Sequence, residues 1–360
     1  MKAANSEDIK LSCRNVWKVY AEGSKNYFDR AGAANAADLA QQMRQDGAIP
    51  AAVDVSFDVH EGEIFVIMGL SGSGKSTVVR CLSRLVEPSH GQILLDGADL
   101  VQKSQKELID IRRHKMGMVF QSFGLLPHLT VSENIAFPLS LQGLPASEQR
   151  EKTKRVIELV GLEGREQSYP RQLSGGQQQR VGIARSLAVE PELWFLDEPF
   201  SALDPLIRRQ MQDEFLRIQS TLKKSIVFIT HDFLEALRIA DRMMIMRDGM
   251  IVQVGTPTEL ILNPADDYVA EFTSDVPLAR VLLAKDVLDT NASAGADLPN
   301  VDSMVCVEEL LPALASSPDG LAVQDKGSNI GVLTAASVIQ ALSQGAEGTS
   351  TDALAQEPAQ

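Results

Sequence analysis

The clearest chemistry in the sequence comes from a run of glycines and serines that contains a lysine. Residues 69–77 read GLSGSGKST and match the P-loop pattern, in which glycines, a lysine and a hydroxyl residue stand at fixed offsets. Glycines let backbone N–H groups turn inward around a phosphate, because no Cβ stands in the way. The residues of this candidate phosphate cradle are Gly69, Ser71, Gly72, Ser73, Gly74, Lys75, Ser76 and Thr77.

Two side chains of the cradle have predicted roles. Lys75 is expected to reach the β- and γ-phosphates of a nucleotide, and the Ser76 hydroxyl is expected to be a ligand of Mg²⁺. The alternative is an ordinary Gly/Ser turn with a solvated lysine. An apolar run at 63–69 precedes the cradle and a helical segment at 76–86 follows it. This context favours the phosphate site, because the start of the helix presents its positive end to the anion.

A pair of carboxylates follows the apolar run 193–196. An acid at the C-terminal end of a parallel strand lies on the edge of the sheet where ligands bind. Asp197 is therefore a candidate Mg²⁺ ligand, and Glu198 is a candidate general base that activates water. The alternative is a strand that ends at solvent in an acidic turn, and the cradle upstream disfavours it.

Alternating strands and helices are needed to bring the phosphate cradle and the carboxylate pair together. Continuous apolar runs are typical of strands that are buried on both faces of a parallel sheet. The predicted strands of this kind are 63–69, 116–120, 193–196 and 225–230, and predicted helices are 76–86, 147–160, 177–188 and 205–222. Further strands are predicted at 11–20 and 52–59, and a hairpin at 241–254. The alternation predicts an α/β sheet with helices packed on it.

The composition limits the class of protein. The chain has 360 residues, 44% of them hydrophobic and 23% charged, which allows two or three domains. A net charge of −14 argues against binding nucleic acid through a general basic surface. Cys13, Cys81 and Cys306 have neither metal-ligand nor disulfide spacing, so we expect a reducing compartment. The N-terminus lacks a signal-peptide core, and the longest apolar stretch, 64–70, is too short to cross a bilayer.

A third motif indicates a family. Residues 173–177, LSGGQ, lie between the cradle and the acidic strand and resemble the signature sequence of ATP-binding-cassette (ABC) ATPases. The other motifs of that family follow in its order, and they are Gln121, the run SALD at 201–204 and His231. The resemblance covers about residues 9–255. It implies an ABC-type P-loop NTPase cassette, an α/β fold with a mixed sheet, covering helices and a helical subdomain at about 122–180.

The resemblance also implies how ATP and Mg²⁺ are bound. Each ATP is expected between the cradle of one subunit and the signature sequence of the other, in a head-to-tail homodimer. The implied nucleotide contacts outside the cradle are Ser174, Gly175, Gly176, Gln177 and, at the dimer seam, Asp204.

Catalytic roles follow from the same resemblance. Glu198 is implied as the base, His231 as a contact of the γ-phosphate, and Gln121 as a contact of Mg²⁺ or water. The alternative for His231 is a histidine at a helix start with no ligand. Tyr20 is a candidate to stack on adenine, and its alternative is a surface tyrosine at a strand end.

Within the family, the sequence resembles the ATPase subunits of glycine betaine/proline uptake systems. The pointers are the insert 21–51 and phrases such as MVFQSFGLLPHLTV and FSALDPLIRRQMQDE. The resemblance implies an importer of glycine betaine/proline/choline-type solutes, with integral-membrane permease subunits and a solute-binding protein as an indirect partner. It also implies a place on the cytoplasmic face of the plasma membrane. The loop 124–129 is a candidate to receive a permease helix, with core packing as its alternative.

Other functions remain open at this point. The chain could serve an importer of another amino acid such as histidine, because the ATPase does not touch the solute. A soluble cassette without a transport role is disfavoured, since the sequence has neither a long coiled-coil insertion nor a second cassette. An exporter ATPase is disfavoured by the phrases shared with the betaine group.

A domain boundary is predicted near residue 275, after an ATPase domain of residues 1–275. The segment 276–345 resembles a single regulatory repeat of the cystathionine-β-synthase (CBS) type, with a hairpin turn at Lys326-Gly327 and a helix after Thr334. Such repeats work in pairs, so the missing half is expected from the other subunit. Docking onto the cassette and a poorly ordered remnant are the alternatives. Residues 346–360 are predicted to be a disordered tail.

Overall fold

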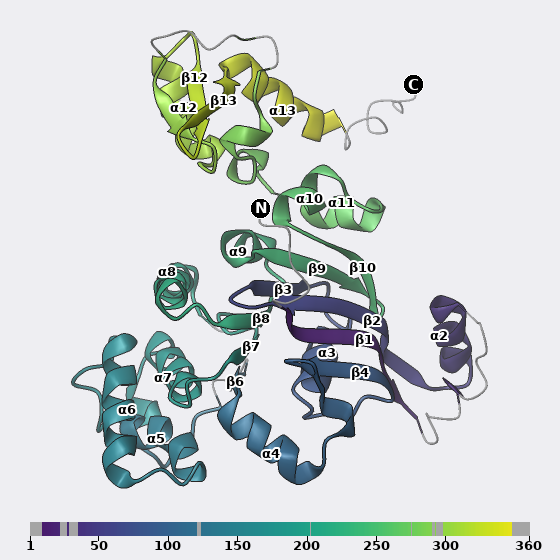
Figure 1. Ribbon diagram of the computed structural model, residues 1–360, viewed down its shortest axis with the longest axis vertical. Coiled ribbons are helices and arrows are strands. Elements are labelled where there is room, and N and C mark those ends of the chain that lie inside the picture. Colours follow the sequence, from purple (N-terminus) through teal and green to yellow (C-terminus); the bar gives the residue numbers. More distant parts are fainter. Residues whose placement is uncertain are drawn as a thin grey trace, which may run out of the picture. The chain divides into compact units, whose positions relative to one another are not determined.

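The computed structural model describes residues 9–21, 27–28, 35–120, 124–201, 203–274, 276–289, 292 and 298–347, except for the side chains of 344–347. The chain divides into two units, Met1–Thr256 and Pro257–Gln360. Figure 1 labels the elements of both units in chain order. The sequence placed the boundary later, near residue 275, which itself lies outside the described residues. The helices α10 (Pro257–Leu262) and α11 (Asp267–Thr273) therefore fall in the second unit.

A six-stranded sheet of order β10-β9-β3-β8-β7-β6 forms the centre of the first unit. Its strands are β3 (Ile64–Met68), β6 (Met116–Val119), β7 (Leu193–Asp197), β8 (Ser225–Ile229), β9 (Arg242–Arg247) and β10 (Met250–Gly255). All neighbours pair in parallel except β10, which pairs antiparallel with β9. Every residue of β3, β7 and β8 is buried, as expected for parallel strands covered on both faces. The predicted strands and the hairpin are confirmed.

The register of this sheet brings the ends of three strands to one edge. Ile229, the last residue of β8, pairs with Ile67 of β3 and with Asp197 of β7. The residues that follow these three strands therefore leave the sheet side by side at one edge. They are the residues of the cradle, Glu198 and the segment that begins at Thr230.

A second, antiparallel sheet of order β2-β1-β4-β5 was not predicted. It contains β1 (Ile9–Tyr20), β2 (Ile49–His60), β4 (His90–Leu95) and β5 (Ala98–Asp99). The first two match predicted strands, but β4 has no clear alternation and β5 has only two residues. Asp96 and Gly97, both with positive φ, form the β4–β5 turn, and this Asp-Gly pair was a usable signal. One hydrophobic core joins both sheets through the helix α3 (Lys75–Leu82).

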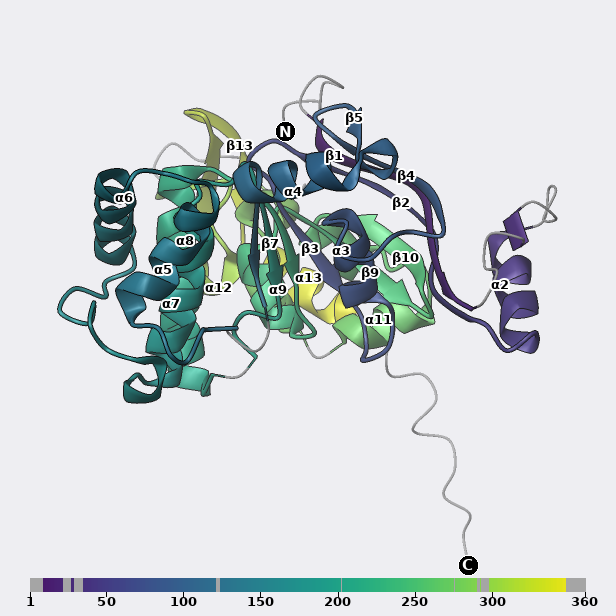
Figure 2. The ribbon, with the colours of Figure 1, turned by 90° about the horizontal axis from the view of Figure 1, so that it is seen from below.

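The remaining helices of the first unit surround the sheets. They are α2 (Ala36–Gln45), α4 (Gln105–His114), α5 (Val131–Leu141), α6 (Ala146–Leu159), α7 (Gly175–Leu187), α8 (Pro205–Leu222) and α9 (Phe233–Ile239). Figure 2 shows α5, α6 and α7 together on the side opposite α2. These three helices pack on one another and correspond to the helical subdomain predicted at about 122–180, although α7 continues to Leu187. No helix in the described ranges combines the length and apolar character that a membrane crossing needs.

The insert between β1 and β2 contributes the helix α2. Asn35 caps its start through Oδ1, and the helix ends before Gly47, which has φ +82°. The buried residues Leu39, Ala40 and Met43 of α2 pack on β1 and β2 in a small hydrophobic cluster of their own.

The second unit contains a three-stranded sheet of order β11-β12-β13. Its elements after α11 are β11 (Asn300–Asp302), α12 (Val307–Ser316), β12 (Leu321–Asp325), β13 (Ser328–Leu333) and α13 (Ala335–Glu347). The strands β11 and β12 are parallel, and β12 and β13 form a hairpin. Lys326 and Gly327 have positive φ at the hairpin turn, as predicted, and α13 begins after Thr334. The predicted tail, 346–360, lies outside the described residues, except that residues 346–347 end α13.

Candidate nucleotide site

The phosphate cradle connects β3 to α3 through a tightly packed loop. Gly69 and Gly74 have φ values of +144° and +101°, which a side chain would disfavour. A Cβ on Gly74 would lie 2.3 Å from the Ala51 carbonyl oxygen, and one on Gly69 would lie 2.3 Å from that of Met246. Glycine is therefore required at both ends of the loop. The loop is held between β2 on one side and the β9–β10 hairpin on the other.

Lys75 lies inside the loop that it belongs to. Its Nζ donates to the carbonyl oxygens of Gly69 at 2.7 Å and of Leu70 at 2.8 Å. The residue is only 6% exposed, and burial lowers the pKa of its ammonium while the nearby carboxylates of Glu198 and Asp197 oppose that shift. The cation is thus fixed at the centre of a ring of backbone groups.

Ser76 and Asp197 meet at the edge of the same loop. The Ser76 hydroxyl donates to Asp197 Oδ1 at 3.2 Å, which links the start of α3 to the end of β7. Asp197 is buried, and burial raises the pKa of its carboxyl while the Ser76 hydrogen bond opposes the shift. A hydroxyl and a carboxylate oxygen are the hard donors that Mg²⁺ prefers, so this pair fits that ion.

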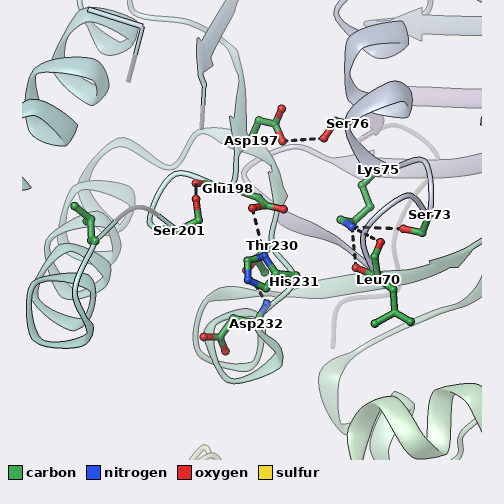
Figure 3. Close-up of polar contacts among 12 residues, drawn as sticks. Leu70, Ser73, Lys75, Ser76, Asp197, Glu198, Ser201, Thr230, His231 and Asp232 are labelled. Atoms are coloured by element: carbon green, nitrogen blue, oxygen red, sulfur yellow. Dashed lines mark hydrogen bonds and ion pairs between the residues drawn. The ribbon is translucent and has the colours of Figure 1, made fainter. Parts of the chain in front are cut away.

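Glu198 and His231 form a second polar pair. His231 Nδ1 lies 3.3 Å from Glu198 Oε2. Glu198 has φ +45°, a left-handed conformation that is uncommon for residues other than glycine and that clusters at functional sites. Its backbone N–H donates to the Ile229 carbonyl, and its own carbonyl accepts a hydrogen bond from the Ser201 hydroxyl at 3.0 Å. Figure 3 shows Glu198 lying between His231 and the Ser76–Asp197 pair.

A cavity of about 640 Å³ joins these groups. Its lining residues are Ala51, Leu70, Ser71, Gly72, Gly74, Lys75, Ser76, Thr77, Glu198 and His231. The structure thus brings most of the predicted cradle together with the predicted base and histidine. Ser73 and Asp197 stand directly behind the lining, where they bond to Lys75 and Ser76.

The signature sequence lies elsewhere in the same chain. Ser174 caps α7, its Oγ accepting from the Gln177 N–H at 3.3 Å while Gln177 Oε1 accepts from the Ser174 N–H at 3.0 Å. Gly175 and Gly176 form the first turn, and a Cβ on Gly176 would lie 2.7 Å from Ile207. None of these residues lines the cavity.

Two further predicted residues, Asp204 and Tyr20, stand apart from the cavity lining. Asp204 caps α8, with Oδ1 accepting from the Ile207 N–H at 3.1 Å. Tyr20 ends β1, is 47% exposed and has Lys18 Nζ 4.8 Å from its ring centroid. Gln121 lies outside the described residues.

Several groups that support the site come from distant segments of the chain and were not predicted from the sequence. Arg208 of α8 donates to the Leu203 carbonyl and to Asp232 Oδ2, both at 3.4 Å, and so links the loop before α8 to the loop that holds His231. Ala51 and the β9–β10 turn pack against the cradle. No local motif marks these residues, because their roles depend on tertiary packing.

Comparison with known proteins shows the family of the chain. Residues 52–201 match the model of the ABC transporter family. The chain is 55% identical over 324 residues to a trimethylamine N-oxide transport system ATP-binding protein of Ruegeria pomeroyi, covering 90% of this chain and 94% of that one. It is 50% identical over 279 residues to a glycine betaine/proline betaine transport system ATP-binding protein of Escherichia coli, covering 78% and 69% respectively.

Solved structures agree with the fold of the first unit. A dimeric ATP-binding cassette in a post-hydrolysis state, bound to ADP and phosphate, aligns with a TM-score of 0.57 and 31% identity. That alignment covers 69% of this chain and 98% of the other. A cassette from Clostridium perfringens that is part of an ABC transporter complex aligns with a TM-score of 0.60 and 25% identity, covering 74% of this chain and 95% of the other.

Proposed function

The chain belongs to the ABC transporter family of ATP-binding proteins, and from that premise we propose that it is the ATPase subunit of an importer of small methylated amines. The solute class is supported by the match to the trimethylamine N-oxide transport protein, which extends over nine-tenths of both chains. Proteins that transport glycine betaine match over a smaller share. Trimethylamine N-oxide and the betaines share a compact methylated nitrogen and no net charge, so one class of solute covers both.

ATP is assigned to the cavity of about 640 Å³. Lys75 exchanges its bonds to the loop carbonyls for bonds to the β- and γ-phosphates, and the backbone N–H groups of the cradle bind the same anion. Ser76 and Asp197 would hold Mg²⁺, which supplies charge neutralisation at the phosphate oxygens when it is bound.

Hydrolysis is assigned to the Glu198–His231 pair. Glu198 accepts the proton of the attacking water, and His231, 3.3 Å from its carboxylate, orients that group and contacts the γ-phosphate. Arg208 joins the loops before α8 and around His231, which supports a coupling between this pair and the dimer seam. Gln121 is assigned to Mg²⁺ or water by family resemblance.

A head-to-tail homodimer completes the site in this proposal. Ser174, Gly175 and Gly176 expose backbone donors at the start of α7, yet they do not line the cavity of their own chain. A second subunit therefore supplies them to the γ-phosphate, with Asp204 at the seam. Related cassettes are dimers in their solved structures, which supports this arrangement.

Adenine is assigned to Tyr20. The residue is half-exposed, and its β1–β2 partner Ile49 lies two residues before Ala51, which lines the cavity. The ring is thus near the cavity and accessible to a planar base, although Lys18 now lies over it.

A permease is expected to dock in an apolar groove of about 510 Å³ between β6 and α5. Phe120, Phe137 and Leu141 line the groove and are each about two-fifths or more exposed, and Gly124 and Leu126 of the predicted docking loop line it too. An amphipathic helix inserts apolar side chains into grooves of this kind. Through such a contact the ATPase would work at the cytoplasmic face of the membrane, with the solute-binding protein as an indirect partner.

The second unit is proposed to be regulatory and CBS-like. Its parallel pair, hairpin and following helix fit that repeat, and Ile330 and Ile339 are exposed, at 42% and 66%. Exposed apolar residues on a small unit fit pairing with the same unit of the other subunit. Docking onto the cassette is the second possibility.

Uptake in cells tests the assignment of the solute. A strain from which this gene is deleted should lose most of its ATP-dependent accumulation of labelled trimethylamine N-oxide or glycine betaine, and the wild-type gene should restore it. The Glu198→Gln gene should fail to restore it. Unchanged uptake of every methylated amine tested, with histidine uptake lost instead, would replace the proposed solute with an amino acid.

A further inference from the structure

The insert helix α2 has no part in the function proposed above. It lies outside the two sheets, and only its face of Leu39, Ala40 and Met43 is buried. These residues pack with Trp17, Val19 and Val53 of β1 and β2. The chain passes from the C-terminal turn of α2 through Gly47 into β2. That strand begins two residues before Ala51, which borders the cradle. The insert is therefore anchored next to the phosphate site.

One side chain extends from α2 to the β9–β10 hairpin. Arg44 Nη2 donates to the Asp248 carbonyl oxygen at 2.9 Å. Asp248 and Gly249 form the tip of the hairpin, with φ values of +52° and +85°. A guanidinium that bonds to this carbonyl fixes the orientation of the turn.

The same turn contacts the phosphate cradle directly. The Gly249 N–H donates to the Ser73 carbonyl at 3.0 Å, and the Gly249 carbonyl accepts from the Val53 N–H at 2.9 Å. A Cβ on Gly74 would lie 3.3 Å from the Gly249 Cα and 2.3 Å from the Ala51 carbonyl oxygen. The turn thus closes the back of the loop at the residues that precede Lys75.

We propose that the insert helix is a positioning element of the nucleotide site, and that Arg44 is its positioning residue. Arg44 holds the 248–249 turn, the turn holds the Ser73 carbonyl, and the Ser73–Gly74 peptide is thereby preset to present its N–H, that of Gly74, to phosphate. Arg44 does not line the cavity assigned to ATP, so it acts on binding and not on the chemical step. The inference rests on the assignment of ATP to this cavity.

The predicted effect is a change of ATP affinity with little change of turnover. Replacing Arg44 by Ala should raise the dissociation constant and KM for ATP about three- to tenfold, because an exposed but charge-assisted hydrogen bond is lost. The kcat should stay within about twofold, since binding to the ground and transition states weakens alike. Arg44→Lys should recover part of the affinity, because one donor to one carbonyl is retained.

The control is Arg155→Ala. Arg155 is also an exposed arginine, but on α6 it bonds to the Glu151 side chain at 3.1 Å, and it does not line the cavity. This variant should leave ATP affinity unchanged. Hydrogen exchange of the Gly249 amide supplies a readout that does not need nucleotide, because opening of the turn exposes that N–H. Exchange should be faster in Arg44→Ala and unchanged in Arg155→Ala.

These measurements test the inference separately from the proposed nucleotide site on which it rests. Unchanged ATP affinity and unchanged Gly249 exchange in Arg44→Ala would overturn the inference, provided that Lys75→Ala still loses ATP binding. A lowered melting temperature with normal ATP affinity would overturn it as well, since that is the effect of a merely structural residue. If Lys75→Ala bound ATP normally, the nucleotide site itself would be misassigned.

Discussion

The lysine of the cradle is held in place by its own loop before a ligand binds. Lys75 is buried and bonds to two carbonyl oxygens of its own loop. These partners compensate the cost of burying an ammonium, so the cation is already in place when phosphate arrives. Ser174, in contrast, lies at an exposed helix start and caps its own helix. Substitutions of these two residues should therefore impair different steps, which are nucleotide binding for Lys75 and dimer formation for Ser174.

Lys75→Ala should weaken ATP binding by the isolated subunit, because the fixed cation at the β- and γ-phosphates is removed. Ser174→Arg should bind ATP normally as a monomer but should not form the ATP-bound dimer, since a long side chain fills the facing cradle. Nucleotide titration and size-exclusion chromatography with ATP distinguish the two variants. An equal loss of nucleotide binding in both would refute the arrangement of two facing cradles.

Glu198→Gln should retain ATP binding and lose turnover by about 10²- to 10⁴-fold, because the general base is gone while the shape of the side chain is kept. The slow variant should accumulate as a dimer with ATP. Steady-state phosphate release and light scattering measure the two effects. Near-normal hydrolysis by the purified variant would remove Glu198 from its assigned role.

Among the helices and strands, those that local sequence patterns determine could be predicted. The apolar runs within β3, β7 and β8 predicted the parallel strands, and the carboxylates of Asp197 and Glu198 at the end of β7 predicted a ligand site at that edge of the sheet. The second sheet escaped prediction because β4 has no clear alternation, β5 has only two residues, and the sheet depends on the pairing of β4 with β1 and of β5 with β4. The link from Arg44 to the 248–249 turn spans more than 200 residues, and no periodicity encodes such a contact.

The proposed role of the groove between β6 and α5 can be tested by substituting a residue that lines it. Leu141→Asp should weaken binding to the permease and lower uptake while leaving ATP hydrolysis by the isolated subunit unchanged, because a charge in the groove must be desolvated on docking. Leu85→Asp is the matched control, since both leucines are 47% exposed and only Leu141 lines the groove. Co-purification with the permease measures the effect. Equal co-purification of both variants would mean that the permease docks elsewhere.

At the scale of the whole molecule, the chain combines two units with separate cores. The first contains the candidate nucleotide site and the apolar groove between β6 and α5, and the second contains its own cluster around Leu310, Leu321 and Leu333. Residues 276–360 have 3 basic and 11 acidic side chains, so much of the negative charge belongs to the second unit. Exposed charge of one sign responds to ionic strength, which suits a regulatory role in solute uptake.

Truncation after Asp275 should leave ATP hydrolysis intact but change its dependence on salt, and it should loosen the nucleotide-free dimer. The reason is that the proposed pairing surface and the acidic side chains are both removed. Hydrolysis rates between low and high salt, with sedimentation of the nucleotide-free protein, measure this. Truncation after Thr256 should behave in the same way. Identical salt dependence and dimerisation in the full chain and both truncated chains would leave the second unit without a regulatory role.

The central claim is that ATP hydrolysis at the 69–77 cradle drives uptake of a methylated amine. Its most direct test is reconstitution of the subunit with its permease and binding protein in vesicles, with labelled trimethylamine N-oxide or glycine betaine offered as solute. The account predicts accumulation that requires ATP, is stimulated by the binding protein, and falls to background with Glu198→Gln. Accumulation that proceeds equally with the Glu198→Gln subunit, or ATP hydrolysis that no methylated amine stimulates, would contradict it.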